Sequence, residues 1–357
     1  MTPAYARAWV VGGPGRFVLE RIALPPLRPG WLRCRVLRFQ PSITDAMRLR
    51  GLADADEFRR GRRFIGHEFV AQVVEVRESA HAATIGQRVV RGSRNPCGAC
   101  AEYLRGRPYL CPQPVRVGEE EPAAMAELID LPADYVHIVP PELSDLAACC
   151  SQPAASSVAN IVHAHLEPGA RVAILGQGIM GPFLLQAAPV HGAAEVLTTA
   201  RRESVRALSV RLGATESLAP DAPETPSRLR EFSPDLVIDA AGGPQSAGLS
   251  GTSTLNQALQ AVRRFGTVLE ISDITVPMKR DPGTWRGEQF GWCLDTMDTR
   301  IMACTLAPWS SFATACCGAT ALLRTRSMAS NACPRRSTSP PGAAKRGYPS
   351  AGGRTGR

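Results

Sequence analysis

Residues 172–181 read Val-Ala-Ile-Leu-Gly-Gln-Gly-Ile-Met-Gly, a short apolar run that ends in a glycine-rich turn. Val172–Leu175 has the length and β-branched content of a buried strand, and the turn follows it without a spacer. A helix is therefore expected to begin at the turn. The first glycine permits the tight turn, the second lets a pyrophosphate approach the backbone, and the third lets the helix pack on the strand.

The spacing of the turn predicts a dinucleotide site formed by Gly176, Gly178, Ile179, Met180 and Gly181. Backbone N–H groups and the positive end of the helix dipole would hold the phosphates there. The Gly-x-Gly-x-x-Gly pattern alone is a weak signal, because many glycine turns match it by chance. The strand before it and the alternating elements after it favour the nucleotide interpretation.

The chain after the turn alternates predicted strands and helices, as in a doubly wound parallel sheet. Apolar runs and helical spacing give strands at 195–199, 235–239 and 266–272, and helices at 203–212 and 255–265. The end of the second strand then decides the cofactor, because NAD sites place an acid about 20 residues after the motif. Here Arg201 and Arg202 follow Ala200, which favours the 2′-phosphate of NADP over NAD. The alternative is two solvated arginines at a strand end.

The composition describes a globular chain of 357 residues, of which 44% are hydrophobic. That length allows two domains with substantial cores. No apolar run approaches the ~18 residues of a membrane span, and the first residues lack a signal-peptide layout, so we expect a cytoplasmic protein with no membrane partner. Eleven cysteines in such a chain indicate metal ligands or free thiols rather than disulfides.

The net charge of +9 is concentrated at the C-terminal end. Residues 291–357 hold nine Lys or Arg and two Asp, which leaves only +2 on the first 290 residues. The excess of basic residues therefore lies in the tail, and no nucleic-acid partner is expected. The tail also contains five of the eleven cysteines and loses amphipathic periodicity. It is either a disordered basic extension or, as we favour, a segment out of frame with the ancestral coding sequence.

The first part of the chain is rich in predicted strands. Short strands broken by Gly and Pro fill residues 8–36, which is typical of a small β-barrel or sandwich. Gly66-His67-Glu68 opens a further strand whose later residues alternate, although a His-Glu pair by itself is more often a polar patch at a strand edge. A cysteine lobe follows, with Cys97, Cys100 and Cys111.

In this order the features resemble the zinc-type medium-chain dehydrogenase/reductase family, the alcohol and polyol dehydrogenases. The resemblance runs from about Ala8 to about Asp273. It includes Ser-x-Thr-Asp at 42–45, Gly-His-Glu at 66–68 and the pair Gln152-Pro153, as well as the glycine turn.

The resemblance implies an α/β architecture in three parts. A GroES-like β-barrel catalytic domain would occupy 1–155, a doubly wound Rossmann nucleotide-binding domain 156–290, and the anomalous tail 291–357. The implied activity is hydride transfer between NADP(H) and a small-molecule alcohol or carbonyl compound, which could be a polyol, sugar, cyclitol or secondary alcohol. The resemblance also leaves open that the protein forms a homo-oligomer.

The resemblance further implies a catalytic zinc, from whose ligands this chain departs. The corresponding positions are Ser42, His67, Glu68 and Gln152, so a serine and an amide stand where a cysteine and a glutamate are expected. A hydroxyl and an amide are weak, neutral ligands beside a thiolate and a carboxylate. Cys149 and Cys150 could substitute, but two small residues on a buried helix are the favoured interpretation.

A second, structural zinc is implied for the cysteine lobe. Cys97, Cys100 and Cys111 match three of the family's four thiolate positions, and Tyr103 occupies the other. Closed structural sites are normally four-coordinate, so three thiolates would need a donor from elsewhere. Whether zinc binds at the catalytic position or in the cysteine lobe is therefore left open.

Two residues beside the catalytic ligand positions match the family better. Thr44 matches the hydroxyl that relays the substrate proton, and Asp45 matches the carboxylate that orients the metal-binding histidine, here His67. Thr44 and Asp45 could instead cap a helix over 46–50, and both roles can coexist. The departures leave two alternatives to a zinc enzyme: a zinc-free NADPH reductase on the same scaffold, and a catalytically inactive nucleotide-binding protein.

Overall fold

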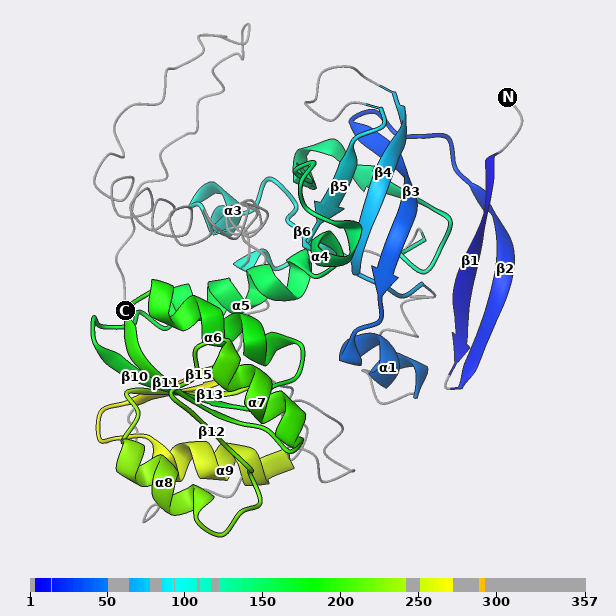
Figure 1. Ribbon diagram of the computed structural model, residues 1–357. Coiled ribbons are helices and arrows are strands. Elements are labelled where there is room, and N and C mark those ends of the chain that lie inside the picture. Colours follow the sequence, from blue (N-terminus) through cyan, green and yellow to red (C-terminus); the bar gives the residue numbers. More distant parts are fainter. Residues whose placement is uncertain are drawn as a thin grey trace, which may run out of the picture. The chain divides into compact units, whose positions relative to one another are not determined.

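The structure is a computed structural model that describes residues 4–13, 15–50, 64–77, 85–92, 94–107, 110–116, 122–241, 251–271 and 289–292. All of these residues belong to one compact unit of the chain, Met1–Thr320. Figure 1 shows antiparallel strands in the N-terminal half and alternating strands and helices after them. None of the helices within the described ranges has the length and apolar character needed to cross a membrane.

A five-stranded antiparallel sheet forms the centre of the N-terminal half, in the order β8-β3-β4-β5-β9. Its strands are β3 (Trp31–Gln40), β4 (Glu68–Val76), β5 (Arg88–Arg91), β8 (Leu128–Pro132) and β9 (Val136–Ile138). Alternate apolar residues such as Leu32, Phe69 and Ile129 meet in one buried cluster. The β-rich first part predicted from the sequence is confirmed.

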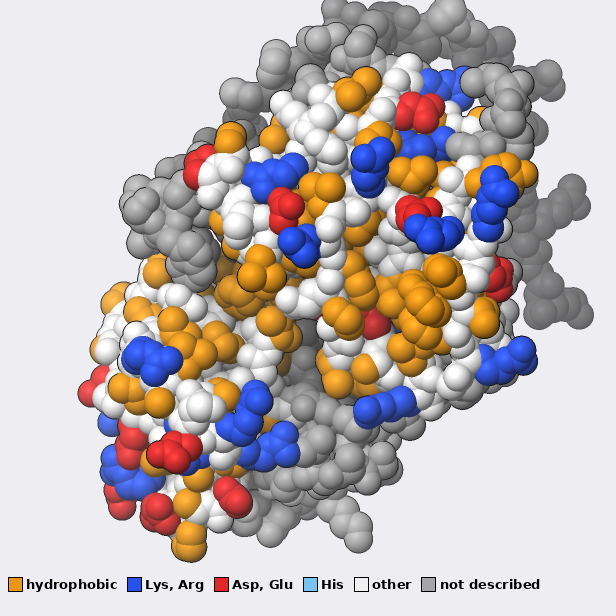
Figure 2. Space-filling model, turned by 45° about the vertical axis from the view of Figure 1, so that its right-hand side comes forward, with side chains coloured by type: hydrophobic (Ala, Val, Ile, Leu, Met, Phe, Trp, Pro, Cys, Tyr) orange, Lys and Arg blue, Asp and Glu red, His pale blue; other side chains and the backbone are white. Residues whose placement is uncertain are grey.

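A two-stranded ribbon of β1 (Ala4–Gly13) and β2 (Arg16–Leu24) lies beside this sheet. The Trp9 and Phe17 rings stack across it with centroids 4.3 Å apart. An isolated bridge from Ala8 to Ala126 ties the ribbon to the rest of the chain. Figure 2 shows hydrophobic side chains gathered between Lys and Arg side chains on one face of the molecule, and the ribbon contributes exposed apolar side chains that include Trp9 and Leu19.

The second half contains a six-stranded parallel sheet in the order β12-β11-β10-β13-β14-β15. Its strands are β10 (Ala170–Leu175), β11 (Ala193–Thr199), β12 (Glu216–Leu218), β13 (Leu236–Asp239), β14 (Thr267–Glu270) and β15 (Gln289–Trp292). This is the strand order of doubly wound dinucleotide-binding sheets, which bind ligands where the order reverses, at the carboxyl ends of the strands. The reversal lies between β10 and β13.

Helices cover both faces of this sheet (Figure 1). They are α5 (Ser151–His163), α6 (Met180–Val190), α7 (Glu203–Arg211), α8 (Thr225–Phe232) and α9 (Gly251–Ala261). In β10, Val172 and Ile174 pack with α5 and α6, while Ala173 and Leu175 pack with α8 and α9. Burial on both faces explains why this strand is a continuous apolar run rather than an alternating one.

Several predicted boundaries of helices and strands differ from the structure. The helix predicted at 46–50 is α1 (Ile43–Leu49), because Ser42 caps it three residues earlier than expected. The helix predicted at 255–265 is α9, which ends at Ala261, and Phe265 beyond it has a positive φ of 61° that a helix does not tolerate. Strand β15 includes two residues beyond 290, and residues 293–357 lie outside the described ranges, so the expectations for the tail stay predictions.

Candidate active site

The glycine turn lies between the end of β10 and the start of α6. Gly176 has a φ of +99°, and its N–H donates to the backbone oxygen of Thr199, 3.1 Å away. A Cβ at this position would lie 2.6 Å from the Cα of Ala241 and 2.7 Å from its N. Only glycine therefore allows the turn to pack directly on the segment that follows β13.

The next residues of the turn fit a phosphate-bearing ligand. A Cβ built on Gly178 would meet nothing within 4 Å, so its backbone faces open space. Both polar atoms of the Gln177 side-chain amide are buried and lack a hydrogen-bond partner among the described residues. Ile179 occupies the N-cap position of α6, with Met180 as the first helical residue. An open backbone and an unpaired amide at a helix N-terminus suit an anionic group.

The carboxyl end of β11 is followed by the arginines that are expected to favour NADP over NAD. Arg201 and Arg202 are both exposed. The sequence analysis missed Arg206, one turn into α7, whose guanidinium Nη1 donates to the backbone oxygens of Ala200 at 2.9 Å and Arg201 at 2.7 Å. Arg206 thus fixes the course of the backbone that presents the other two side chains.

The Ser-x-Thr-Asp element forms the start of α1. The Ser42 hydroxyl donates to Asp45 Oδ2 at 2.9 Å and accepts from the Asp45 N–H at 3.1 Å, while the Ser42 N–H donates to Asp45 Oδ2 at 3.0 Å. This is a capping box in which both residues are buried. The cap therefore consists of Ser42 and Asp45, and Thr44, predicted as part of it, lies half-buried inside the helix.

Asp45 also connects α1 to the strand that bears His67. Its Oδ1 accepts the Gly66 N–H at 3.1 Å and lies 3.7 Å from His67 Nδ1. Burial by itself would raise the pKa of Asp45, but the hydrogen bonding and charge of His67 and the bonds from Ser42 lower it to about 2. The ionised carboxylate faces the His67 ring, whose side chain is 13% exposed, and the orienting role that the resemblance implies for Asp45 stays a prediction.

Glu68 is held by a residue that the sequence analysis missed. Gln40 is its register partner across β3 and β4, and the Gln40 amide nitrogen donates to the Glu68 carboxylate. The Cys150 thiol donates to the amide oxygen of Gln40, Oε1, at 3.2 Å. Burial raises the pKa of Glu68, while the charge of His67 and the bond from Gln40 act against that rise.

Cys149 and Cys150 end the short helix α4 (Asp145–Cys149). The Cys149 thiol donates to the backbone oxygen of Glu68 at 3.5 Å. Burial raises the pKa of both thiols, that of Cys149 to about 12. Cys149 is buried and Cys150 partly buried, and both observations favour the interpretation of two small residues on a buried helix over that of substitute metal ligands. Gln152 follows them, buried in the first turn of α5.

The donors at the catalytic ligand positions do not fit a zinc ion. The Ser42 hydroxyl is used as donor and acceptor within the cap, and the Glu68 carboxylate is bound by Gln40. Among the described residues, His67 and Glu68 belong to no group of three His, Cys, Asp or Glu whose ligand atoms lie within 4.8 Å of one another. Gln152 would add only a neutral amide to this set.

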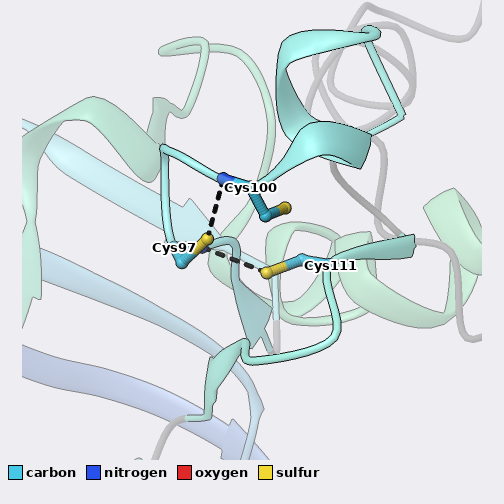
Figure 3. Close-up of side chains that lie close together, drawn as sticks. All are labelled: Cys97, Cys100 and Cys111. Carbon is cyan, nitrogen blue, oxygen red and sulfur yellow. Dashed lines mark hydrogen bonds between the residues drawn. The ribbon is translucent and has the colours of Figure 1, made fainter. Parts of the chain in front are cut away.

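The cysteine lobe does form such a group. The sulfurs of Cys97, Cys100 and Cys111 all lie within 4.8 Å of one another, and Figure 3 shows the three side chains at the lobe formed by α3 (Ala101–Leu104) and its flanking turns. The Cys97 N–H donates to Cys111 Sγ and the Cys100 N–H to Cys97 Sγ, each at 3.3 Å (Figure 3). The lobe therefore offers three gathered thiols, which fit three of the four corners of a tetrahedral zinc site.

Tyr103 occupies the position of the fourth thiolate. Its N–H donates to Cys100 Sγ at 3.3 Å, as expected for a residue in the ligand turn. Burial raises the pKa of Tyr135 to about 12, and the charge and hydrogen bonding of Tyr103 add to that rise. A phenol is thus present where the resemblance places the fourth thiolate.

We expect Tyr103→Cys to increase the zinc retained by the lobe. A fourth thiolate would complete a closed tetrahedral site, and such sites bind zinc far more tightly than open ones. Metal analysis after dialysis against a mild chelator should give about one additional zinc per chain. Tyr103→Phe, which removes the hydroxyl without adding a thiolate, should retain the same zinc as the parent. Equal zinc in Tyr103→Cys and the parent would show that the turn does not aim residue 103 at the three sulfurs.

Comparison with known proteins agrees with this architecture. The model of the alcohol dehydrogenase GroES-like domain matches residues 29–141. D-arabitol-phosphate dehydrogenase of Enterococcus avium is 29% identical over 215 residues, 58% of each chain. L-threonine 3-dehydrogenase of Coxiella burnetii is 34% identical over 157 residues, 43% of this chain and 45% of that protein. The chain thus matches about half the length of these curated relatives.

Solved structures show the same fold over most of the chain. A putative zinc-binding dehydrogenase of Sinorhizobium meliloti bound to NADP superposes with a TM-score of 0.75 at 22% identity, covering 88% of this chain and 90% of that one. Galactitol-1-phosphate dehydrogenase of Escherichia coli gives a TM-score of 0.71 at 19% identity, with 88% and 89% covered. The matched domain and the relatives support the predicted resemblance to the zinc-type medium-chain dehydrogenase/reductase family, and the predicted α/β fold is confirmed.

Proposed function

We propose that this protein is an oxidoreductase that transfers hydride between NADP(H) and an alcohol or ketone substrate. The cofactor assignment rests on the exposed Arg201 and Arg202 at the end of β11, where NAD sites carry an acid. The glycine turn at the strand-order reversal and the dehydrogenase names of the relatives support the activity. A polyol, sugar, cyclitol or secondary alcohol are all candidate substrates. We also propose a cytoplasmic location and a homo-oligomer.

The residues of the turn and of β11 would bind the cofactor, which when bound supplies or accepts the hydride. The open backbone at Gly178 would receive the pyrophosphate at the start of α6. Arg201 and Arg202 would hold the 2′-phosphate through charge-assisted hydrogen bonds.

His67 and Thr44 are the residues suited to move the substrate proton. Oxidation of an alcohol releases its hydroxyl proton, and reduction of a ketone requires one. With Nδ1 directed at the ionised Asp45, His67 would exchange that proton at Nε2. Thr44, half-buried on α1, would relay it through its hydroxyl.

The reaction has two candidate forms, the zinc-dependent one that the resemblance implies and a zinc-free one on the same scaffold, and a specific observation favours the zinc-free form. Ser42 stands at a ligand position, yet its hydroxyl is committed to the capping box with Asp45. In that case proton transfer by His67 would operate without a Lewis acid at residues 42, 67, 68 and 152.

Metal analysis together with a cofactor titration separates these candidates. Purified protein would be analysed for zinc and then assayed with NADPH and NADP⁺ against a set of ketones and alcohols. Turnover that disappears with removal of zinc supports the zinc enzyme, and turnover unaffected by chelation supports the zinc-free reaction. Tight NADPH binding without turnover on any substrate would contradict both and leave a nucleotide-binding protein.

We expect NADPH to bind more tightly than NADH, and Arg201→Ala to remove most of that preference. A hydrogen bond to a charged group is worth about 1.5–3 kcal/mol, so the preference should be roughly tenfold or more. Fluorescence titration of both cofactors measures it. Arg211→Ala removes an exposed arginine from the far end of α7 and should leave both affinities unchanged. Equal affinities in the parent, or an unchanged preference in Arg201→Ala, would exclude NADP selection by this strand end.

A further inference from the structure

The three thiols of the cysteine lobe differ in their access to solvent. Cys97 is exposed, Cys100 is partly buried and Cys111 is buried, and all three are free. Their sulfurs nevertheless lie within 4.8 Å of one another. An accessible thiol with a second thiol beside it is the arrangement in which oxidation of the first ends in a disulfide.

The hydrogen bonds of the lobe favour one pair of sulfurs over the others. Cys111 Sγ accepts the Cys97 N–H at 3.3 Å, so this sulfur lies against the Cys97 backbone. In Figure 3 the Cys111 side chain points toward Cys97, whereas the Cys100 sulfur points away from it. Cys100 Sγ accepts the Tyr103 N–H at 3.3 Å and caps α3. A bond between Cys97 and Cys111 leaves that cap intact, and a bond between Cys97 and Cys100 would draw the capping sulfur away.

The other cysteines within the described ranges are less accessible than Cys97. Cys34 is buried in β3. Cys149 is buried and Cys150 partly buried, and their thiols donate to the backbone oxygen of Glu68 and to the Gln40 side chain. Cys97 is therefore the one exposed thiol in the part of the chain that the structure describes, and it meets a reagent in solution first.

We propose that Cys97 and Cys111 are a modification site for peroxide, which converts the two thiols to a disulfide. The Cys97 sulfur attacks one oxygen of hydrogen peroxide, the O–O bond breaks, and Cys97 becomes a sulfenic acid as water leaves. The Cys111 sulfur then displaces the hydroxyl group from the Cys97 sulfur, which forms the S–S bond and releases a second water. The two sulfurs give up two electrons to the peroxide, and both thiol protons leave in the water.

The disulfide and a metal ion exclude each other at the lobe, because both need the sulfurs of Cys97 and Cys111. A fourth thiolate would close a zinc site around these sulfurs. With Tyr103 at that position the closed site is incomplete, so the thiols stay available to peroxide. The disulfide would fasten the two ends of the lobe to each other without a metal. This inference does not depend on hydride transfer or on the binding of NADP(H).

The first test maps the disulfide in the full-length protein. Protein freed of metal by a chelator would be treated with hydrogen peroxide, alkylated, and digested with trypsin without reduction. Cleavage after Arg94, Arg105 and Arg116 separates Cys97 from Cys111, in peptides 95–105 and 106–116. The treated parent should give these two peptides linked, lighter by two hydrogen atoms than their sum. Reduction with dithiothreitol should release them.

Serine variants identify the sulfurs that form the bond. Cys100→Ser is the matched control and should still give the linked peptides, whereas Cys97→Ser and Cys111→Ser should not. Circular dichroism checks that each variant folds. If one of them does not, fragmentation of the linked peptides from the parent still locates the bond at Cys97 or at Cys100.

The second test traps the intermediate. In Cys111→Ser the sulfenic acid has lost the thiol that consumes it, so dimedone added with the peroxide should label Cys97 several-fold more than in the parent. Label on Cys100 instead of Cys97 would overturn the assignment of the attacking sulfur.

Three results of the mapping would overturn the proposed pair. They are a main product joining Cys97 to Cys100, linked peptides in Cys97→Ser, and a parent whose Cys97 and Cys111 stay reduced at a peroxide dose that oxidises its methionines.

Discussion

Replacement of Gly176 by Ala is expected to lower the free energy of unfolding by about 3 kcal/mol and to abolish nucleotide binding. A φ of +99° costs an L-residue about 1–2 kcal/mol. The new Cβ would also lie 2.6 Å from the Cα of Ala241, a backbone atom that cannot move aside as a side-chain end can. Overpacking of this kind typically adds about 1–3 kcal/mol. Urea denaturation followed by circular dichroism measures the change.

Gly178→Ala is the matched control for that experiment. Gly178 has no positive φ, and its Cβ would meet nothing within 4 Å, so stability should change by less than about 0.5 kcal/mol. Nucleotide binding should still weaken, because the methyl group enters the space assigned to the pyrophosphate. Parent-like stability in Gly176→Ala would contradict the geometry of the turn. Parent-like NADPH affinity in Gly178→Ala would contradict the assignment of the nucleotide site.

The second large effect is expected for Asp45→Asn. This variant keeps the shape of the side chain but removes the charge that faces His67 and Arg48, so we expect a loss of about 3 kcal/mol at neutral pH. A carboxyl pKa lowered by folding contributes stability above its ordinary value near 4, and that contribution is lost as pH falls toward about 2. The difference between the parent and Asp45→Asn should therefore narrow in acid.

Ser42→Ala separates the charge of Asp45 from the helix cap. It removes the capping hydroxyl, which should cost about 1 kcal/mol. Because that hydroxyl is only one of several groups that lower the pKa of Asp45, the cost should depend less on pH than the cost of Asp45→Asn. A variant Asp45→Asn that stays within about 1 kcal/mol of the parent, or that differs from it equally at all pH values, would show that the carboxylate does not stabilise this site through its charge.

The sequence predicted the elements of the nucleotide half well because they carry strong local signals. The run at 172–175 is apolar throughout because the strand is buried on both faces. Gly176 has a positive φ, which residues with a side chain rarely adopt, so its glycine is a clear local signal of the turn. Predictions of boundaries were weaker. The start of α1 was missed although Ser42 and Asp45 have the spacing of a capping box, because Ser42 was interpreted only as a departure from a metal ligand.

The contacts that the sequence did not reveal all depend on register between distant strands. Gln40 meets Glu68 only because β3 and β4 pair with those residues opposite each other. Asp239 and Glu270 are 31 residues apart and become neighbours only through the register of β13 and β14. A one-residue slip would turn either partner to the other face of its sheet, so local patterns cannot predict such pairs.

The bonds from Arg206 to the backbone at the end of β11 have a consequence for protein engineering. Because one guanidinium holds the carbonyl groups of residues 200 and 201, the course of the chain there does not depend on the side chains that it displays. Under the proposed binding of NADP(H), coenzyme choice would thereby be separated from folding. An acidic substitution at Arg201 or Arg202 would then favour a ribose hydroxyl without rebuilding the strand end, which would make this position a practical starting point for redesign toward NAD.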